Sequence, residues 1–156
     1  MITKITNNLY IGDLDDVANR DAENFIQLIR SLGVTTIISL LETKETHEEN
    51  LVETALQEGT KIKYVWFPID SGKRDVADEF SDAYNRLVAI LAQTGEVVLL
   101  HCRAGIDRAP FLAALYLHHH LNISIQEAYT IIKKKRPCVI EHYEWLAALE
   151  KKNTRF

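Results

Sequence analysis

The sequence predicts an α/β fold in which a largely parallel central sheet is flanked by helices on both faces. Segments rich in β-branched and apolar residues alternate with amphipathic segments of helical spacing along the 156 residues. Residues 96–100 are almost continuously apolar, which is typical of a strand buried on both faces of a parallel sheet. Neither an internal repeat nor a change in composition divides the chain, so we expect one domain over residues 1–156.

The first half of the chain is expected to hold three strands and two helices. Apolar side chains recur at helical spacing up to Gly33, and a β-branched run typical of a buried strand follows. Another such run ends at Pro68, which cannot continue a strand within a sheet. In order, the expected elements are a strand over 8–12, a helix over 22–32, a strand over 34–41, a charged amphipathic helix over about 46–59 and a strand over 61–67.

The second half is expected to be mainly helical. Pro110 falls in the first turn of one helix, where a missing N–H costs little. Ser124 and Glu127 have the spacing of a capping box at the start of another helix. In order, the expected elements are a helix over 75–93, a strand over 96–100, and helices over 108–120, 124–136 and 141–152.

Composition and charge exclude several classes of protein. The net charge of −4 argues against general binding of nucleic acid. No apolar run is long enough to span a bilayer, and the N-terminus lacks the apolar core of a secretory signal, so we expect a cytoplasmic protein without a membrane partner. Two cysteines, Cys102 and Cys138, exclude a disulfide framework. We expect Cys138 in the core, and the run Lys133 to Arg136 as a solvated basic cluster at a helix end.

The segment 101–108 lies between the most apolar strand and the start of a helix. Ligands bind at the carboxyl ends of strands in open α/β sheets, and the amides of such a loop form an anion-binding concavity. Gly105 allows the backbone to wrap closely, and Arg108 can offer two donors to a phosphate. Cys102 in the same positive surroundings is expected as a thiolate, which is a nucleophile suited to phosphoryl transfer.

The pattern His101-Cys102-x-x-Gly105-x-x-Arg108 is the signature of cysteine-dependent protein tyrosine phosphatases, and the chain resembles their small dual-specificity branch over nearly its whole length. The resemblance implies a protein tyrosine phosphatase-like fold and hydrolysis of phosphomonoesters through a cysteinyl-phosphate intermediate, without metal or other cofactor. It implies that Cys102 and Arg108 are catalytic. The implied substrate-binding residues are His101, Arg103, Ala104, Gly105, Ile106 and Asp107.

The resemblance also implies an aspartic acid, about thirty residues before the cysteine, that protonates the leaving group. Asp70 precedes Cys102 by 32 residues, follows a strand end and is close to Gly72, which gives the segment mobility. Asp75 is the competitor, but it is interpreted as a cap of the following helix. The sequence therefore favours Asp70 as the general acid.

Two residues depart from the family pattern. Ala109 stands where the family commonly has Ser or Thr, whose hydroxyl helps the thiolate to leave. Asp107 puts a carboxylate beside the anion site, and we expect it to point away or to pair with Arg103.

The expected substrate is a phosphorylated protein. Phosphotyrosine is the preferred residue, and phosphoserine and phosphothreonine are further substrates. The alternatives are a phosphatase of a glucan, a phosphoinositide or an RNA 5′-phosphate, and a phosphate-binding pseudophosphatase, which Ala109 motivates. A rhodanese-like sulfurtransferase also has a cysteine in a loop at a strand end. Its loop is typically shorter than the seven residues from Cys102 to Arg108.

Overall fold

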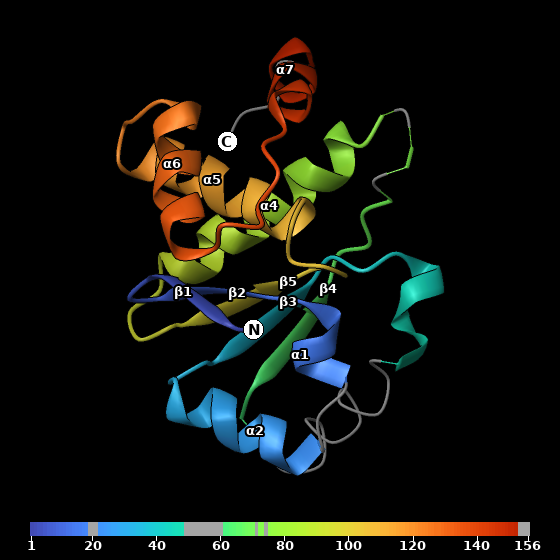
Figure 1. The fold of residues 1–156 in the computed structure, drawn as a ribbon, viewed down its shortest axis with the longest axis vertical. Helices are drawn as coiled ribbons and strands as arrows, with labels where there is room; N and C mark the ends of the chain where they lie inside the picture. Colours follow the sequence, from blue (N-terminus) through green and yellow to red (C-terminus); the bar gives the residue numbers. More distant parts are fainter. Residues whose placement is uncertain (19–21, 49–60, 71, 74, 153–156) are drawn as a thin grey trace.

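A five-stranded sheet runs through the centre of the molecule in the order β1-β2-β5-β3-β4 (Figure 1). The computed structural model describes residues 1–18, 22–48, 61–70, 72, 73 and 75–152. The strands are β1 (Thr3–Thr6), β2 (Leu9–Gly12), β3 (Thr36–Ser39), β4 (Lys63–Trp66) and β5 (Val98–His101). Neighbouring strands from β2 to β4 pair in parallel, and β1 pairs antiparallel with β2 at the edge. The expected α/β fold with a largely parallel sheet is confirmed.

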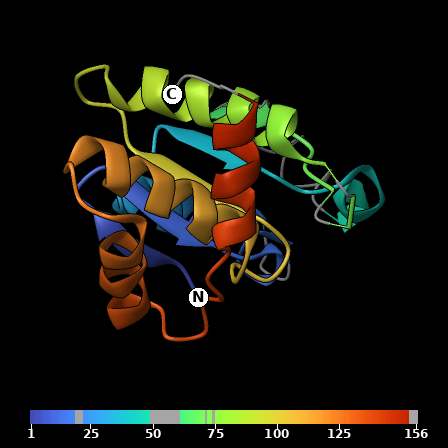
Figure 2. The ribbon, with the colours of Figure 1, turned by 90° about the horizontal axis from the view of Figure 1, so that it is seen from above.

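Helices cover both faces of the sheet (Figures 1 and 2). On one side lie α4 (Ala77–Leu91), α5 (Arg108–His120), α6 (Ile125–Lys135) and α7 (Tyr143–Lys151), and on the other lie α1 (Leu14–Ala18) and α2 (Ala22–Ser31). A short 3-10 helix, η1 (Thr43–Glu48), follows β3. None of the helices within the described residues is long and apolar enough to cross a membrane.

The alternation of side chains along the strands divides the core into two parts. Leu100 and Ile38 belong to the larger cluster, which α4, α5 and α6 complete. Their neighbours Leu99 and Ile37 belong to the smaller cluster beneath α2. Because successive side chains of a strand point to opposite faces, each buried strand contributes to both clusters. The continuously apolar sequence of β5 follows from this arrangement.

The register of the parallel strands brings the candidate loop together with three other segments. His101 at the end of β5 pairs with Gly12 of β2 and with Ser39 of β3, and Ser39 pairs with Trp66 of β4. The carboxyl ends of these strands therefore meet at one edge of the sheet, and the segments that leave them lie around the loop that begins at Cys102.

Most of the expected elements are present, with ends that differ by a few residues. The capping box of α6 is confirmed, since the Glu127 N–H donates to Ser124 Oγ at 3.0 Å, and Pro110 lies in the first turn of α5 as expected. Two elements were not predicted, β1 and α1. The helix expected over 46–59 lies largely outside the described residues, and its first three positions fall in η1.

Candidate functional site

The loop between β5 and α5 turns its peptide carbonyls outward. The carbonyl oxygens of four successive residues accept hydrogen bonds from the surrounding protein: Arg103 from Leu14 N at 2.8 Å, Ala104 and Gly105 from the Arg136 side chain at 3.5 and 2.7 Å, and Ile106 from Ile140 N at 3.0 Å. The C=O and N–H of one planar trans peptide unit point in opposite directions. The N–H groups of residues 104–107 therefore face the interior of the loop, where they form a concavity suited to an anion.

Cys102 lies at the base of this concavity. Its side chain is buried, and the Ala109 N–H in the first turn of α5 donates to Sγ at a distance of 3.5 Å. His101 is fully buried as the last residue of β5, with its ring Nδ1 3.4 Å from the Cys102 carbonyl oxygen. The sulfur is thus placed between the loop amides and the N-terminus of a 13-residue helix, both of which favour negative charge.

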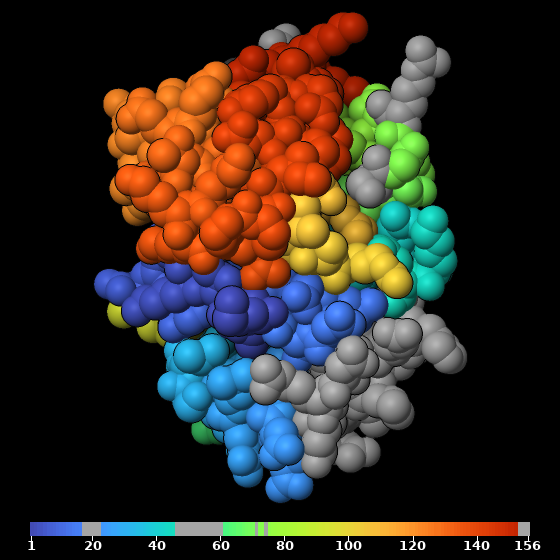
Figure 3. All heavy atoms as spheres, viewed as in Figure 1, coloured from blue at the N-terminus to red at the C-terminus, as the bar shows by residue number. Residues whose placement is uncertain are grey.

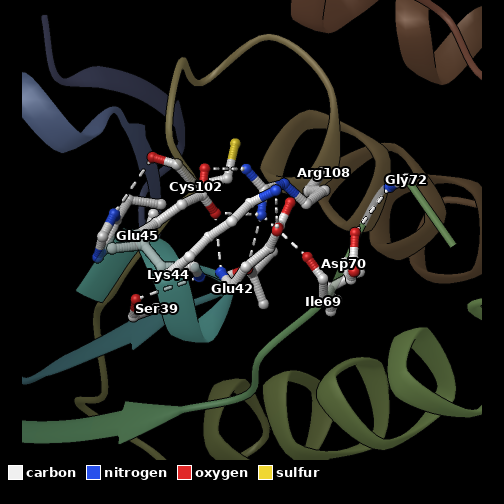
Figure 4. A network of polar contacts seen from close by, with 12 residues as sticks. Ser39, Glu42, Lys44, Glu45, Ile69, Asp70, Gly72, Cys102 and Arg108 are labelled. Carbon is white, nitrogen blue, oxygen red and sulfur yellow. Dashed lines mark hydrogen bonds and ion pairs between the residues drawn. The ribbon is translucent and has the colours of Figure 1, made fainter. Parts of the chain in front are cut away.

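Arg108 is held by groups from the ends of two neighbouring strands (Figure 4). Its Nη1 donates to Glu45 Oε1 at 2.9 Å and its Nη2 to Glu45 Oε2 at 3.2 Å. Nη1 also lies 3.1 Å from the Leu40 carbonyl oxygen and 2.9 Å from that of Ile69. The guanidinium side chain is only 6% exposed, so these contacts fix it at the edge of the loop.

Glu45 is a site residue that the sequence did not reveal. Burial would raise its pKa, but the hydrogen bonds from Arg108 and the Glu42 backbone, together with the positive charges of Arg108 and Arg103, outweigh that effect and hold the pKa below its ordinary value of 4.5. The one sequence feature that could have pointed to Glu45 is its position as an acidic residue shortly after a buried strand. In the sequence that signal is shared by Glu42, whose side chain instead pairs with the exposed Lys44.

Asp70 and Asp75 have different surroundings. Asp70 directly follows Ile69, whose carbonyl binds Arg108, and its Oδ1 accepts from Gly72 N at 2.9 Å. It also lines a cavity of about 440 Å³ between the segment after β4 and the segment after β3. Asp75 instead forms an ion pair with Lys152 at 2.9 Å, and that hydrogen bond lowers its pKa. Of the two residues, only Asp70 adjoins a contact to Arg108.

The expectation that the basic cluster at the end of α6 is solvated is wrong for Arg136. The side chain of this residue is 6% exposed and donates to the Gly105 carbonyl, to the Met1 carbonyl at 2.5 Å and to Thr3 Oγ1 at 2.9 Å. The reason is that α6 ends at Lys135, and the next side chain turns in between the N-terminal strand and the loop. Arg136 thereby ties the loop to β1.

Gly105 is required by this packing. Its φ is +65°, in the region that side-chain-bearing residues rarely adopt, and a Cβ there would lie 2.9 Å from the Gly12 carbonyl oxygen. The close wrapping expected of Gly105 is therefore observed directly.

Two smaller expectations are corrected. The Asp107 carboxylate does not pair with Arg103, one of its two expected arrangements, but binds His142, with Oδ1 2.7 Å from Nε2. Cys138 is exposed and not in the core, because it lies in the turn between α6 and α7. The contact between Asp107 and His142 could not be predicted from the sequence, because the two residues are 35 positions apart and belong to different elements.

The loop reaches the surface of the molecule. Figure 3 shows it, in yellow, between the segment that precedes α7 and the segment that follows β3. Arg103 and Ala104 are exposed, whereas Cys102 and Arg108 beneath them are buried. The two residues of this segment that are expected to be catalytic thus lie on its protected side.

Comparisons with known proteins agree on a single family. The family model described as dual specificity phosphatase, catalytic domain, matches residues 18–155. Human dual specificity protein phosphatase 5 is 31% identical over 91 residues, which are 58% of this chain and 23% of the relative. Human dual specificity protein phosphatase 4 is 25% identical over 142 residues, which are 90% of this chain and 32% of the relative. The chain therefore spans only a quarter to a third of the length of these relatives.

Solved structures share the fold. The human tyrosine phosphatase-like serine/threonine/tyrosine-interacting protein superposes with a TM-score of 0.77 at 18% identity, covering 97% of this chain and 95% of that one. The PTP-2 phosphatase of Cydia pomonella gives a TM-score of 0.75 at 21% identity, covering 97% of this chain and 89% of that one.

Proposed function

Because the chain belongs to the family of dual specificity phosphatase catalytic domains, we propose that it is a cysteine-dependent protein phosphatase acting on phosphotyrosine, and also on phosphoserine and phosphothreonine. The observation that carries the proposal is the 102–108 loop, in which the buried Cys102 sulfur, the inward-facing amides and Arg108 surround one space. A nucleophile and an array of fixed donors around one phosphate are what this hydrolysis needs.

Within the described residues, one edge of the Arg108 guanidinium is left for the substrate. A guanidinium has five N–H donors, two on each Nη and one on Nε. The contacts to Glu45, Leu40 and Ile69 occupy Nη1 and one hydrogen of Nη2. The Nε hydrogen and the second Nη2 hydrogen are then the pair that binds two equatorial oxygens of the phosphate. Glu45 thus orients Arg108 without competing for that edge.

In the first step, the Cys102 thiolate attacks phosphorus and the bond to the leaving oxygen breaks. The amides of residues 104–107 and Arg108 stabilise the negative charge on the equatorial oxygens. Asp70 gives its proton to the leaving oxygen, so that tyrosine departs as a neutral phenol. The position of Asp70 beside Ile69, which itself binds Arg108, supports this assignment.

In the second step, water attacks the cysteinyl-phosphate, Asp70 takes a proton from that water, and the S–P bond breaks to release phosphate. Ala109 has no hydroxyl to assist the departing sulfur. Its backbone N–H, which donates to Sγ at 3.5 Å, supplies a hydrogen bond to the thiolate in place of a side chain. This contact supports turnover over mere binding of phosphate.

The proposal is tested by comparing kcat/KM on a panel of substrates, with Cys102→Ser as the control for contaminating activity. The panel holds phosphotyrosine, phosphoserine and phosphothreonine peptides, a phosphoinositide, a phosphoglucan and an RNA 5′-phosphate. We expect the highest value on a phosphotyrosine peptide. A higher value on a non-protein substrate would overturn the substrate assignment. Binding of phosphate without turnover on any substrate would identify a pseudophosphatase.

A further inference from the structure

His142 connects the phosphate loop to the start of α7. Its ring Nε2 lies 2.7 Å from Asp107 Oδ1, and its Nδ1 lies 2.5 Å from Glu144 Oε1. The ring stacks on Trp145 with centroids 3.8 Å apart, and the His142 backbone N–H donates to the Tyr129 hydroxyl at 3.1 Å. The imidazole is therefore held along both edges and on one face.

The contacts of the ring require its charged form. An ionised carboxylate only accepts hydrogen bonds, so an imidazole that bonds two carboxylates must carry a proton on both nitrogens. Burial would lower the pKa of His142, but the hydrogen bonds with Asp107 and Glu144 and the negative charges of these carboxylates together outweigh that effect and raise the pKa above 6.5. The Tyr129 hydroxyl from α6 accepts from the backbone N–H of His142. Among the described residues, the carboxylates of Asp107 and Glu144 are the charged groups that contact the ring.

Aromatic side chains of the core support the ring from behind. Trp145 packs against Phe80 of α4, with centroids 4.8 Å apart, and against Phe111 of α5 at 5.4 Å. His142 is thereby anchored to the core on the same side of the sheet as the helix that begins at Arg108. A displacement of the loop near Asp107 would lengthen the 2.7 Å contact to the ring.

The negative charge of Asp107 lies next to the proposed phosphate site, and His142 can neutralise it. It immediately precedes Arg108, and a carboxylate there opposes the binding of a phosphate dianion. We propose that His142, as an imidazolium, is a positioning residue that cancels the charge of Asp107 and holds this side of the loop in its anion-binding shape. The inference rests on the proposed function, in which this loop binds phosphate. It follows that phosphate affinity falls when His142 loses its proton.

The test measures the inhibition constant of inorganic phosphate from pH 5.5 to 9 in wild type, His142→Gln, Asp107→Asn and the double variant. Gln keeps a hydrogen-bond donor but carries no charge, so it separates charge from contact. At pH 6 we expect His142→Gln to bind phosphate roughly tenfold more weakly, the factor for one pKa unit of charge interaction. The matched control is His120→Gln, an exposed histidine at the end of α5, which should behave as wild type.

The double variant decides between a charge effect and a merely structural one. If His142 acts by neutralising Asp107, removing both charges restores affinity to within about threefold of wild type, because the two effects are coupled. Asp107→Asn alone should bind phosphate at least as tightly as wild type above neutral pH, a result obtainable even if His142→Gln does not fold. No recovery in the double variant, or identical pH profiles for wild type and Asp107→Asn, would overturn the inference.

Failure of the proposed function would give a result different from failure of the role inferred for His142. If wild type neither binds phosphate nor hydrolyses para-nitrophenyl phosphate at any pH, the loop is not a phosphate site and the inference falls with it. If wild type does both and only the pH profiles are unaffected, the phosphatase stands and the role of His142 is refuted.

Discussion

At the scale of single residues, Arg108 depends on Glu45 for its orientation. The pair is buried, with side-chain exposures of 6% and 7%, and two parallel hydrogen bonds join it. Removing one partner of a buried ion pair leaves an uncompensated charge, which is strongly destabilising. Orientation of Arg108 and stability of this edge of the sheet therefore depend on the same carboxylate.

Glu45→Gln should lower kcat/KM by about 10- to 100-fold, because a small misplacement of Arg108 is costly to the transition state. It should also lower the melting temperature. Steady-state kinetics on para-nitrophenyl phosphate and thermal melting measure the two effects. The control is Glu42→Gln, which removes the ion pair with the exposed Lys44 but no hydrogen bond to Arg108, and should change kcat/KM by less than about threefold. Equal effects of the two substitutions would contradict the role given to Glu45.

Asp70→Asn should lower kcat/KM on phosphotyrosine peptides by about 10²–10⁴-fold, the usual contribution of general acid catalysis. The loss should be smaller on aryl phosphates with acidic leaving groups, which depart without a proton. The substitution should also flatten the basic limb of the kcat/KM profile on peptides. Asp75→Asn is the matched control, since Asp75 pairs with Lys152. If the control flattens that limb and Asp70→Asn does not, the general acid is Asp75.

At the scale of elements, the sequence predicted the strand–loop–helix unit that holds the candidate site. The apolar run of β5, the glycine-containing loop and Pro110 in the first turn of α5 are local signals, and all three appear as expected. β1 was not predicted, because a four-residue edge strand has only a half-buried alternation and depends on pairing with β2.

The residues that surround the loop are the part that the sequence did not reveal. Glu45, Arg136 and His142 come from the segment after β3, the end of α6 and the start of α7. Each is defined by a contact with a residue far along the chain, so no local pattern marks it. The basic run that ends at Arg136 was predicted to be solvated because it lies at a helix end, although the turn after α6 buries Arg136.

Gly105→Ala tests whether the shape of the loop matters apart from its side chains. The added Cβ meets the Gly12 carbonyl oxygen at 2.9 Å in a backbone with a φ of +65°, so the loop must open. We expect loss of phosphate binding, measured by calorimetry, in a protein that keeps its far-ultraviolet circular dichroism. Gly95→Ala is the control, because Gly95 has a φ of +85° but nothing within 4 Å of the added atom. Phosphate binding that survives in both variants would contradict the assigned geometry.

At the scale of the whole molecule, the ion pairs around the loop make stability depend on pH in two directions. The pKa of His142 is raised above 6.5, so its contribution is fully present below that value and is lost as the pH rises through the folded-state pKa. The pKa of Glu45 is lowered below 4.5, so its contribution is present above that value and is lost as the pH falls through the folded-state pKa.

The difference in melting temperature between wild type and His142→Gln should therefore be largest near pH 5.5 and should shrink toward pH 9. At pH 5.5 the imidazolium is fully formed in both the folded and the unfolded chain, and only the folded one pairs it with Asp107 and Glu144. Differential scanning calorimetry at intervals of one pH unit gives the profile. A difference that is constant with pH would mean that the ring contributes only by packing on Trp145.

In the proposed mechanism, Cys102 forms a covalent bond to the phosphate that it removes. The most direct measurement is rapid acid quenching during turnover of para-nitrophenyl phosphate, followed by peptide mass spectrometry. We predict a phosphorylated peptide that contains Cys102 in wild type. Cys102→Ser should show neither this adduct nor turnover while still binding phosphate. Turnover retained in Cys102→Ser, or phosphate trapped on any other residue, would contradict the mechanism.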